Sequence, residues 1–396
     1  MSGSPLRVLH LFANYKWTGP ADPALRCAVW DERCGAELAF AQAAWTLPGA
    51  EHRMARELWN ARLPVVAGLE LRKHFRPTSI LRDSRRLAAR LRRDRFDVVH
   101  THLLGDHLIA ALALRGLGDE RPVLLRSLYD ADAPRRGWRS WLAFGATDGV
   151  IVPTAELAEQ LRARFGFATE RVLVQDPPTE NFRAGYRGDL RARLGLTKDD
   201  FVIGMTARIQ PHRRFDLAWD VLARLVAEEP RVRFVLLGRG NAEDTERQVL
   251  EPIRSRGLER HAILPGYLYE PEYGLALRAF DAFLFLVPGS DGTCRALREV
   301  TALGIPAVGT ERGLIPFLLG PQPGDATLQP CGLAVPETPT ALAGALLRLA
   351  REPELRARLG AAGRARALRS AEPAAAARRR LAFALACGAR RAGARP

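Results

Sequence analysis

The sequence has very little lysine. Its three lysines are Lys16, Lys73 and Lys198, so nearly all of the 59 basic residues are arginine. Arginine and alanine are frequent along the whole chain, which indicates a coding bias as much as a binding surface. The net charge of +15 favours a nucleic-acid partner, but no zinc-finger spacing, RNP-like aromatic motif or basic-region heptad is present. We therefore prefer an anionic small molecule or an anionic membrane surface, and expect no nucleic acid.

Cysteine and long apolar runs are scarce as well. The five cysteines are odd in number and lack metal-ligand spacing, which disfavours a disulfide framework or a zinc site. No apolar run approaches the length of a membrane span, and residues 1–8 lack the apolar core of a signal peptide. We expect a cytoplasmic protein, with a peripheral position at the inner face of the membrane left open.

Hydrophobic residues make up 47% and charged residues 26% of the 396 positions, which fits two folded α/β domains. Apolar segments alternate with amphipathic ones, a pattern typical of parallel sheets with crossover helices. Strands are expected at 7–12, 37–40, 96–100, 123–127, 149–152 and 172–175, and again at 201–205, 233–238, 262–264, 282–287 and 306–309. The fold class is therefore two Rossmann-like doubly wound domains facing a cleft, with ligands at the strand carboxyl ends.

The expected domains follow from where this pattern stops and restarts. They are an N-terminal acceptor domain at 1–180, a linker at 181–200, a donor domain at 201–370 and a helical tail at 371–396. The tail is expected to be able to pack back on the N-terminal domain.

Two acids separated by seven residues stand near the end of the second half. Asp291 and Glu299 enclose a turn formed by Gly292, Thr293 and Cys294. We expect the turn to open the helix that carries Glu299, and the N–H groups at a helix start suit an anion. We also expect both acids to share one helical face toward the cleft.

Two arginines follow the strand at 201–205. The guanidinium groups of Arg208 and Arg213 match the oxygens of a diphosphate and stabilise its charge without a metal. Each arginine alone is equally well read as a surface ion pair, and His212 or Arg214 could replace Arg213. Cys294 is expected to be a small packing residue, because no base partner is evident.

The order of these segments resembles the retaining GT-B glycosyltransferases of glycosyltransferase family four. The acid pair resembles that family's E-x7-E region, and residues 280–290 resemble the strand and Pro-Ser loop before it. Residues 207–213 resemble its G-R-L-x-x-x-K segment, and residues 236–240 its I-V-G-x-G turn. The N-terminal half is similar more loosely, through residues 97–102 and the loop at Gly19.

This resemblance implies transfer of a hexose-type sugar from a nucleotide-diphosphate donor, with retention and without a metal or other cofactor. It implies that Glu299 binds the ribose hydroxyls and that Asp291 contacts the sugar. His102 resembles the family's active-site histidine, and Gly19 would let the first loop approach the donor. Tyr267 is placed to touch the base.

The candidate site residues form a catalytic group and a donor-binding group. The catalytic candidates are His102, Asp291 and Arg208; the donor-binding candidates are Gly19, Arg208, Arg213, Tyr267, Gly292, Thr293, Cys294 and Glu299. We expect only one of His100 and His102 to face the cleft because the two alternate on a strand. The resemblance favours His102, and His107 is expected to be structural.

Departures from the family pattern keep other functions open. Asp291 stands where the family has glutamate, and Arg213 where it has lysine. A degenerate GT-B protein that binds a nucleotide, a glycan or a partner is one alternative, and a nucleotide-sugar epimerase of the same fold is another. A phosphorylase is disfavoured, because Lys198 alone could supply a pyridoxal lysine in the second half.

The acceptor is not identified by the sequence. The predicted helix at 78–95 is rich in arginine, which indicates either a solvated face or docking on an anionic membrane that presents a lipid-linked acceptor.

Overall fold

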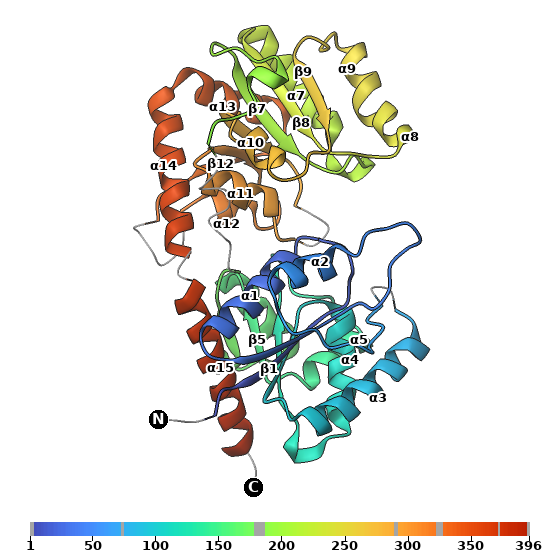
Figure 1. Ribbon diagram of the computed structural model, residues 1–396. Coiled ribbons are helices and arrows are strands. Elements are labelled where there is room, and N and C mark those ends of the chain that lie inside the picture. Colours follow the sequence, from blue (N-terminus) through green and yellow to red (C-terminus); the bar gives the residue numbers. More distant parts are fainter. Residues whose placement is uncertain are drawn as a thin grey trace. The chain divides into compact units, whose positions relative to one another are not determined.

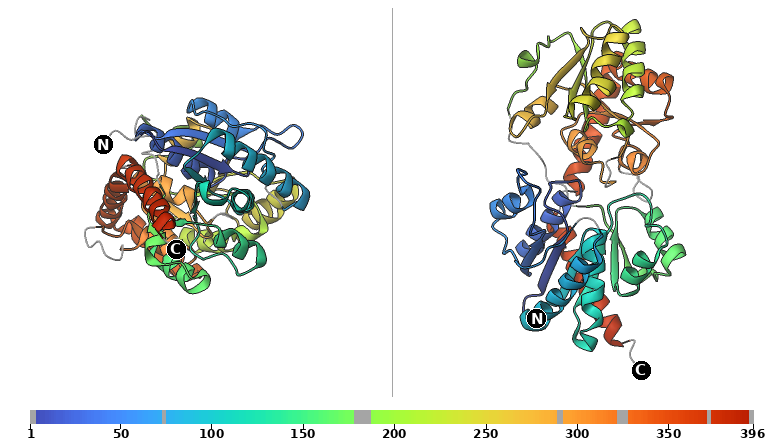
Figure 2. Two further views of the ribbon diagram at one scale, coloured as in Figure 1. Left: turned by 90° about the horizontal axis from the view of Figure 1, so that it is seen from below. Right: turned by 90° about the vertical axis from the view of Figure 1, so that its right-hand side faces the viewer.

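The computed structural model describes residues 4–72, 75–177, 187–288, 292–321, 328–370 and 373–393. The chain forms two compact units, unit 1 with Met1–Glu180 and Glu372–Pro396, and unit 2 with Asn181–Ala371. Each unit contains a six-stranded parallel sheet flanked by helices (Figures 1 and 2). The expected two-domain, Rossmann-like α/β fold is confirmed. The predicted linker at 181–200 lies partly outside the described residues, and its described part belongs to unit 2.

The sheet of unit 1 has the order β2-β1-β3-β4-β5-β6. Its strands are β1 (Arg7–Phe12), β2 (Glu37–Gln42), β3 (Val98–Thr101), β4 (Val123–Ser127), β5 (Gly149–Val152) and β6 (Val172–Val174). Its helices are α1 (Ala21–Arg33), α2 (Arg53–Asn60), α3 (Pro77–Asp94), α4 (Leu104–Arg115), α5 (Trp138–Gly145), α6 (Ala155–Phe165) and α15 (Pro373–Gly393). Alternate residues of β1 enter separate cores, Leu9 and Leu11 in one and Val8 and Phe12 in the other, so both faces of the sheet are covered.

The sheet of unit 2 has the order β12-β11-β10-β7-β8-β9. Its strands are β7 (Phe201–Thr206), β8 (Val232–Leu237), β9 (Ala262–Gly266), β10 (Ala282–Phe285), β11 (Ala307–Thr310) and β12 (Gly332–Val335). Its helices are α7 (Phe215–Glu228), α8 (Ala242–Thr245), α9 (Glu251–Ser255), α10 (Glu272–Leu277), α11 (Arg295–Ala302), α12 (Ile315–Leu319), α13 (Pro339–Arg351) and α14 (Pro353–Ser370). The sequence did not predict β12. None of the described helices combines the length and apolar character needed to cross a bilayer.

The direction of strand order reverses once in each sheet. The reversal falls between β1 and β3 in unit 1 and between β7 and β10 in unit 2. In open parallel sheets, ligands bind beyond the carboxyl ends of the strands at such a point. The fold therefore marks one edge in each unit where a site is expected.

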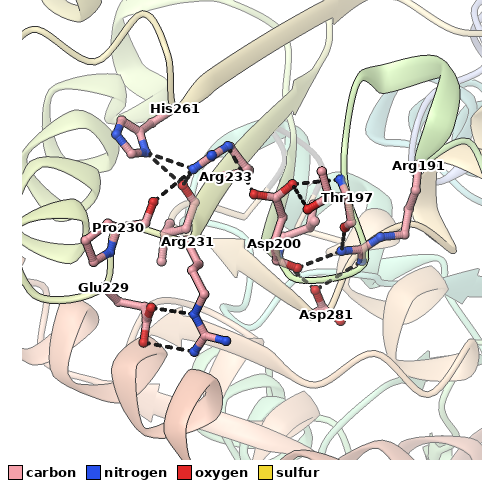
Figure 3. A network of polar contacts seen from close by, with 11 residues as sticks. Arg191, Thr197, Asp200, Glu229, Pro230, Arg231, Arg233, His261 and Asp281 are labelled. Atoms are coloured by element: carbon pink, nitrogen blue, oxygen red, sulfur yellow. Dashed lines mark hydrogen bonds and ion pairs between the residues drawn. The ribbon is translucent and has the colours of Figure 1, made fainter.

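The opposite, amino-terminal edge of the unit 2 sheet is held by a polar network (Figure 3). Arg191 donates to the carbonyl oxygens of Thr197 at 2.9 Å and Asp200 at 2.6 Å, and contacts the Asp281 carboxylate at 3.2 Å. Asp281 also accepts the backbone N–H of Val202 at 2.8 Å. These contacts fasten residues 191–200 to the starts of β7 and β10, so this edge is occupied by structural contacts.

The last helix, α15, packs on α1 through a buried ion pair. Arg380 and Asp31 are each 2% exposed, and their side chains form a salt bridge. Arg380 also donates to the Cys27 carbonyl oxygen at 3.3 Å. The absence of a side chain at Gly149 lets α15 also approach β5, because a Cβ there would lie 2.7 Å from the Cys387 sulfur.

Removal of the buried carboxylate should therefore destabilise unit 1. We expect Asp31→Ala to lower the free energy of unfolding by about 3–5 kcal/mol, because Arg380 would remain buried without its counter-charge. Glu352→Ala is the matched control: its exposed pair with Arg348 is worth at most about 1 kcal/mol. Denaturant unfolding followed by circular dichroism measures both. Equal losses in the two variants would contradict the structural role of the pair.

Candidate functional site

A tight turn precedes helix α11 at the carboxyl edge of the unit 2 sheet. Gly292 and Cys294 have positive φ angles of 71° and 49°, and Thr293 between them is buried. Arg298 of α11 donates to the Thr293 carbonyl oxygen at 3.1 Å and braces the turn. The first N–H groups of a helix lack partners within the helix, so this turn directs donors that suit an anion.

Asp291, the first acid of the predicted pair, lies outside the described residues. The helix begins at Arg295, and the expectation that Asp291 and Glu299 share one helical face stays a prediction. Glu299 is the fifth residue of α11, just beyond its first turn.

Glu299 is buried, with 4% exposure. Tyr273 of α10 donates its hydroxyl to one carboxylate oxygen at 2.8 Å, and Arg295 donates its Nε to the other at 2.8 Å. A buried carboxylate needs such partners because its desolvation is costly. Sequence reasoning missed both. Arg295 was detectable, since it precedes Glu299 by one helical turn, whereas Tyr273 comes from another helix.

The two predicted arginines lie beyond the neighbouring strand, β7. Arg213 donates to the Pro288 carbonyl oxygen at 3.2 Å, in the chain that leaves β10. Arg208 is exposed and has no hydrogen bond or ion pair to another residue in the described part of the chain. Arg214, which could have replaced Arg213, instead pairs with Asp216 at 3.1 Å. Arg213 therefore extends across the β7–β10 reversal point toward the approach to α11.

Tyr267 follows β9 at the same edge and is 41% exposed. The guanidinium of Arg239, which follows β8, lies 4.6 Å from the centre of the Tyr267 ring. Tyr269 packs edge-on against the same ring, with 4.9 Å between centres. An exposed ring on the outer strands offers a stacking surface, and its contact with a base stays a prediction.

Three histidines form a cluster at the carboxyl edge of unit 1. His10 comes from β1, His100 from β3 and His102 from the residues after β3, and each is at most 1% exposed. The rings of His100 and His102 are 4.4 Å apart. The expectation that only one of them faces the site is wrong, because residues two apart on a strand point to the same side. Gly19 lies in the loop between β1 and α1.

Both ring nitrogens of His102 are engaged. Its Nδ1 lies 2.6 Å from the Tyr129 hydroxyl, and its Nε2 lies 3.0 Å from Nδ1 of His10. Nε2 of His10 is 3.4 Å from Asp31, whose carboxylate can only accept. The consistent assignment places the His10 proton on Nε2, beside Asp31 but without a hydrogen bond, with His102 donating to His10 and Tyr129 donating to His102. Burial lowers the pKa of His102 well below its usual value, so the ring is neutral.

The cluster also has the spacing of a metal site. The three histidines offer ring nitrogens within 4.8 Å of one another. Arg380 and Asp31 act in opposite directions there: after the larger effect of burial, Asp31 raises the pKa of His10, and Arg380 lowers the pKa of His10 and His100. Sequence reasoning overlooked one Asp-x-Asp triplet, Asp130–Asp132, which is exposed in the loop after β4. The described residues show no third metal ligand beside it.

His107 lies outside this cluster. It is fully buried, and its Nε2 donates to the Thr147 hydroxyl at 2.7 Å. Thr147 in turn donates to the Ala143 carbonyl oxygen at 2.8 Å, linking α4 to the end of α5. These contacts agree with a structural role.

The two Rossmann-like units, each with a reversal point at its carboxyl edge, have the GT-B fold. Residues 187–366 match the family of "Glycosyl transferases group 1", and residues 40–177 match "Glycosyltransferase Family 4". Between them, these matches span most of both units. The chain belongs to glycosyltransferase family four.

Curated relatives carry one recurring name. The chain is 29% identical over 238 residues to D-inositol 3-phosphate glycosyltransferase 1 of Catenulispora acidiphila, covering 55% of this chain and 56% of the relative. It is 33% identical over 152 residues to the D-inositol 3-phosphate glycosyltransferase of Streptomyces bingchenggensis, covering 35% and 33%. The chain thus matches little more than half the length of the first relative and a third of the other.

Solved structures share the fold at low identity. HepE of Anabaena, crystallised with UDP, has a TM-score of 0.72 at 16% identity and covers 96% of this chain and all of its own. A glycosyltransferase of Rickettsia africae has a TM-score of 0.77 at 14% identity, covering 97% and 99%. A putative UDP-N-acetylglucosamine 2-epimerase of Listeria monocytogenes has a TM-score of 0.65 at 14% identity, covering 96% of both.

The buried histidines predict how stability depends on pH. Burial lowers the pKa of His10, His100, His102 and His107, so the folded chain keeps them neutral while the unfolded chain protonates them below about 6.5. Stability is therefore present above pH 6.5 and is lost as the pH falls, by up to about 1.4 kcal/mol per pH unit for each group. Asp106 opposes this trend, because burial raises its pKa to about 7 and its protonation favours the folded state.

Urea unfolding at pH 5, 6 and 7 tests this dependence. We expect His107→Gln to reduce the slope of stability against pH relative to the parent. His212→Gln, at an exposed position, is the control and should leave the slope unchanged. A parental slope that persists in His107→Gln would show that burial does not hold this histidine neutral.

Proposed function

We propose that this chain transfers a sugar from a nucleotide-diphosphate donor to an acceptor hydroxyl with retention of configuration. The observation that carries the proposal is the carboxyl edge of unit 2, where buried Glu299 stands one turn into α11 and Arg213 extends toward the approach to that helix. Glu299 receives the ribose hydroxyls, and Tyr267 stacks on the base. Asp291 contacts the sugar.

The leaving diphosphate gives the arginines their role. Negative charge accumulates on it as the sugar departs, and fixed donors already in place stabilise that charge without reorganising. Arg208 and Arg213 supply guanidinium groups, and the turn at Gly292, Thr293 and Cys294 supplies N–H groups at the start of α11. In this proposal, arginine side chains and helix N–H groups supply the positive charge that stabilises the leaving diphosphate.

His102 acts as a neutral hydrogen-bonding group in this proposal. Its two ring nitrogens contact Tyr129 and His10, so contact with the transferred sugar requires one of these partners to yield. His10 is the better candidate, because its own contact with Asp31 is long at 3.4 Å.

A uridine donor is the first to test, because HepE, a structural neighbour, was crystallised with UDP. The acceptor is proposed to be a polyol or a polyol phosphate on the strength of the names of the curated relatives. An epimerase remains the second candidate because the Listeria neighbour carries that name. It would change its UDP-sugar without any acceptor.

Donor binding can be measured by thermal shift with UDP-, GDP- and dTDP-sugars. We expect at least one donor to stabilise the parent and Glu299→Gln to weaken that response at least tenfold in apparent affinity, because a charge-assisted hydrogen bond to ribose is lost. The control is Glu229→Gln, a paired carboxylate at the amino edge of the same sheet, which should bind like the parent. An unchanged response in Glu299→Gln rejects the ribose site.

Metal removal tests the electrostatic part of the proposal. We expect donor turnover to be unaffected by EDTA and by added Mg²⁺ or Mn²⁺. In the same assay, Arg213→Met should lower kcat/KM by about two orders of magnitude or more, since a guanidinium to phosphate contact is lost from the transition state. Activity that disappears with EDTA and returns with a divalent ion would overturn this metal-free assignment.

The acceptor's setting is also part of the proposal. If the polyol phosphate is carried on a lipid, the chain must reach an anionic membrane, and the helix predicted at 78–95 is the first candidate surface. It corresponds to α3.

A further inference from the structure

Helix α3 does not offer the unpaired basic face that its sequence suggested. Arg82 pairs with Glu70 at 2.7 Å, Arg90 pairs with Asp94 at 2.6 Å, and Arg92 donates to the Gly116 carbonyl oxygen at 2.5 Å. The contacts of Arg82 and Arg92 join α3 to other parts of its own unit, and the pair of Arg90 with Asp94 lies within the helix. A surface for an anionic partner must therefore be sought elsewhere in unit 1.

Large aromatic side chains are exposed nearby, at the start of α5. Trp138 is 63% and Trp141 72% exposed, and the ring of Phe75, just before α3, lies 5.7 Å from that of Trp138. The guanidinium of Arg139 lies 4.7 Å from the Phe75 ring and 5.7 Å from the Trp138 ring. We call Phe75, Trp138, Arg139 and Trp141 the aromatic face; Figure 1 shows α3, α4 and α5 side by side.

The chain around the aromatic face carries charge of one sign. Residues 75–81 and 133–147 contain four arginines and no aspartate or glutamate. Arg76 and Arg135 are exposed beside the aromatic residues. Exposed tryptophan costs free energy in water, so a face of this kind is expected to meet an apolar or interfacial surface.

We propose that the aromatic face docks unit 1 on an anionic lipid bilayer. Tryptophan rings are favoured at the level of the lipid headgroups, and arginine forks bind lipid phosphates. Each arginine near an anionic leaflet adds about fivefold to the affinity. A second copy of the chain is a poorer occupant, because a two-fold contact would place two acid-free, arginine-bearing faces against each other.

This inference extends the proposed function by naming the surface at which a lipid-linked acceptor would be met. Docking itself does not require catalysis, so the two can fail separately. Binding is measured by co-sedimentation with vesicles of phosphatidylcholine alone and with about 30% phosphatidylglycerol, while donor binding is measured on the same protein by thermal shift.

We expect the full-length parent to bind the anionic vesicles at least about tenfold more tightly than the neutral ones, and to release them as salt rises from about 0.05 M to about 0.5 M. Trp138→Ser with Trp141→Ser should lower binding at least about tenfold, and Arg139→Gln about fivefold. Trp59→Ser is the matched control, because Trp59 is the most exposed tryptophan described, at 82%, and lies on α2 of the same unit.

Several results would overturn the proposal. The proposal fails if the parent binds neither vesicle at low salt, or if the double tryptophan variant binds like the parent. A loss in Trp59→Ser equal to that of the double variant would reduce the effect to general surface hydrophobicity. If sedimentation equilibrium shows self-association that only the double variant abolishes, the face contacts a second copy instead. Unchanged donor binding and an unchanged unfolding midpoint in the double variant ensure that a loss reflects docking.

Discussion

The strands in each of the two sheets run parallel to their neighbours, and this single constraint decides where chemistry can gather. Parallel strands present all their carboxyl ends at one edge. In unit 2 that edge brings Arg213 after β7 to the carbonyl of Pro288 after β10. The amino edge is filled by Arg191, Asp200 and their partners (Figure 3). Structural contacts thus occupy the amino edge, and the proposed donor site lies at the opposite edge of the same sheet, so loops at the carboxyl edge can vary without loosening the strands.

Burial of Glu299 raises the question of how a residue with two partners can still receive a ligand. A carboxylate has about four acceptor positions. Tyr273 and Arg295 each donate to one oxygen, and two donors alone do not exhaust these positions, so the proposed contact with ribose hydroxyls does not require either donor to leave. The same two donors fix the orientation of the carboxylate, which reduces the ordering cost when a donor binds. The positive charge of Arg295 beside Glu299 is therefore compatible with the proposed ribose contact.

Local patterns predicted most strands because apolar segments of four to six residues are bounded by clear turns. The strand β12 was missed because Gly332–Val335 is short and begins with glycine. The turn at Gly292 was predicted because the segments that resemble the family occur in the family's order. What could not be predicted came from distant elements: Tyr273 reaches Glu299 from α10, and His10 reaches His102 from β1. That His100 and His102 lie on the same face could have been predicted, because residues two apart on a strand point to the same side.

The arginine content shows why a charge count is a poor guide to a binding surface. In α3 the guanidinium groups are used within the unit, in pairs such as Arg90 with Asp94 and in contacts such as Arg92 with the Gly116 carbonyl. Such groups contribute to the net charge of +15 but offer little to a partner. A surface becomes attractive to an anion where acids are absent nearby, because cations there have no counter-charge to displace. Residues 133–147 lack acids and also expose tryptophan. Arginine without nearby acids together with exposed tryptophan suits the interface between water and lipid, whereas neither feature alone indicates it.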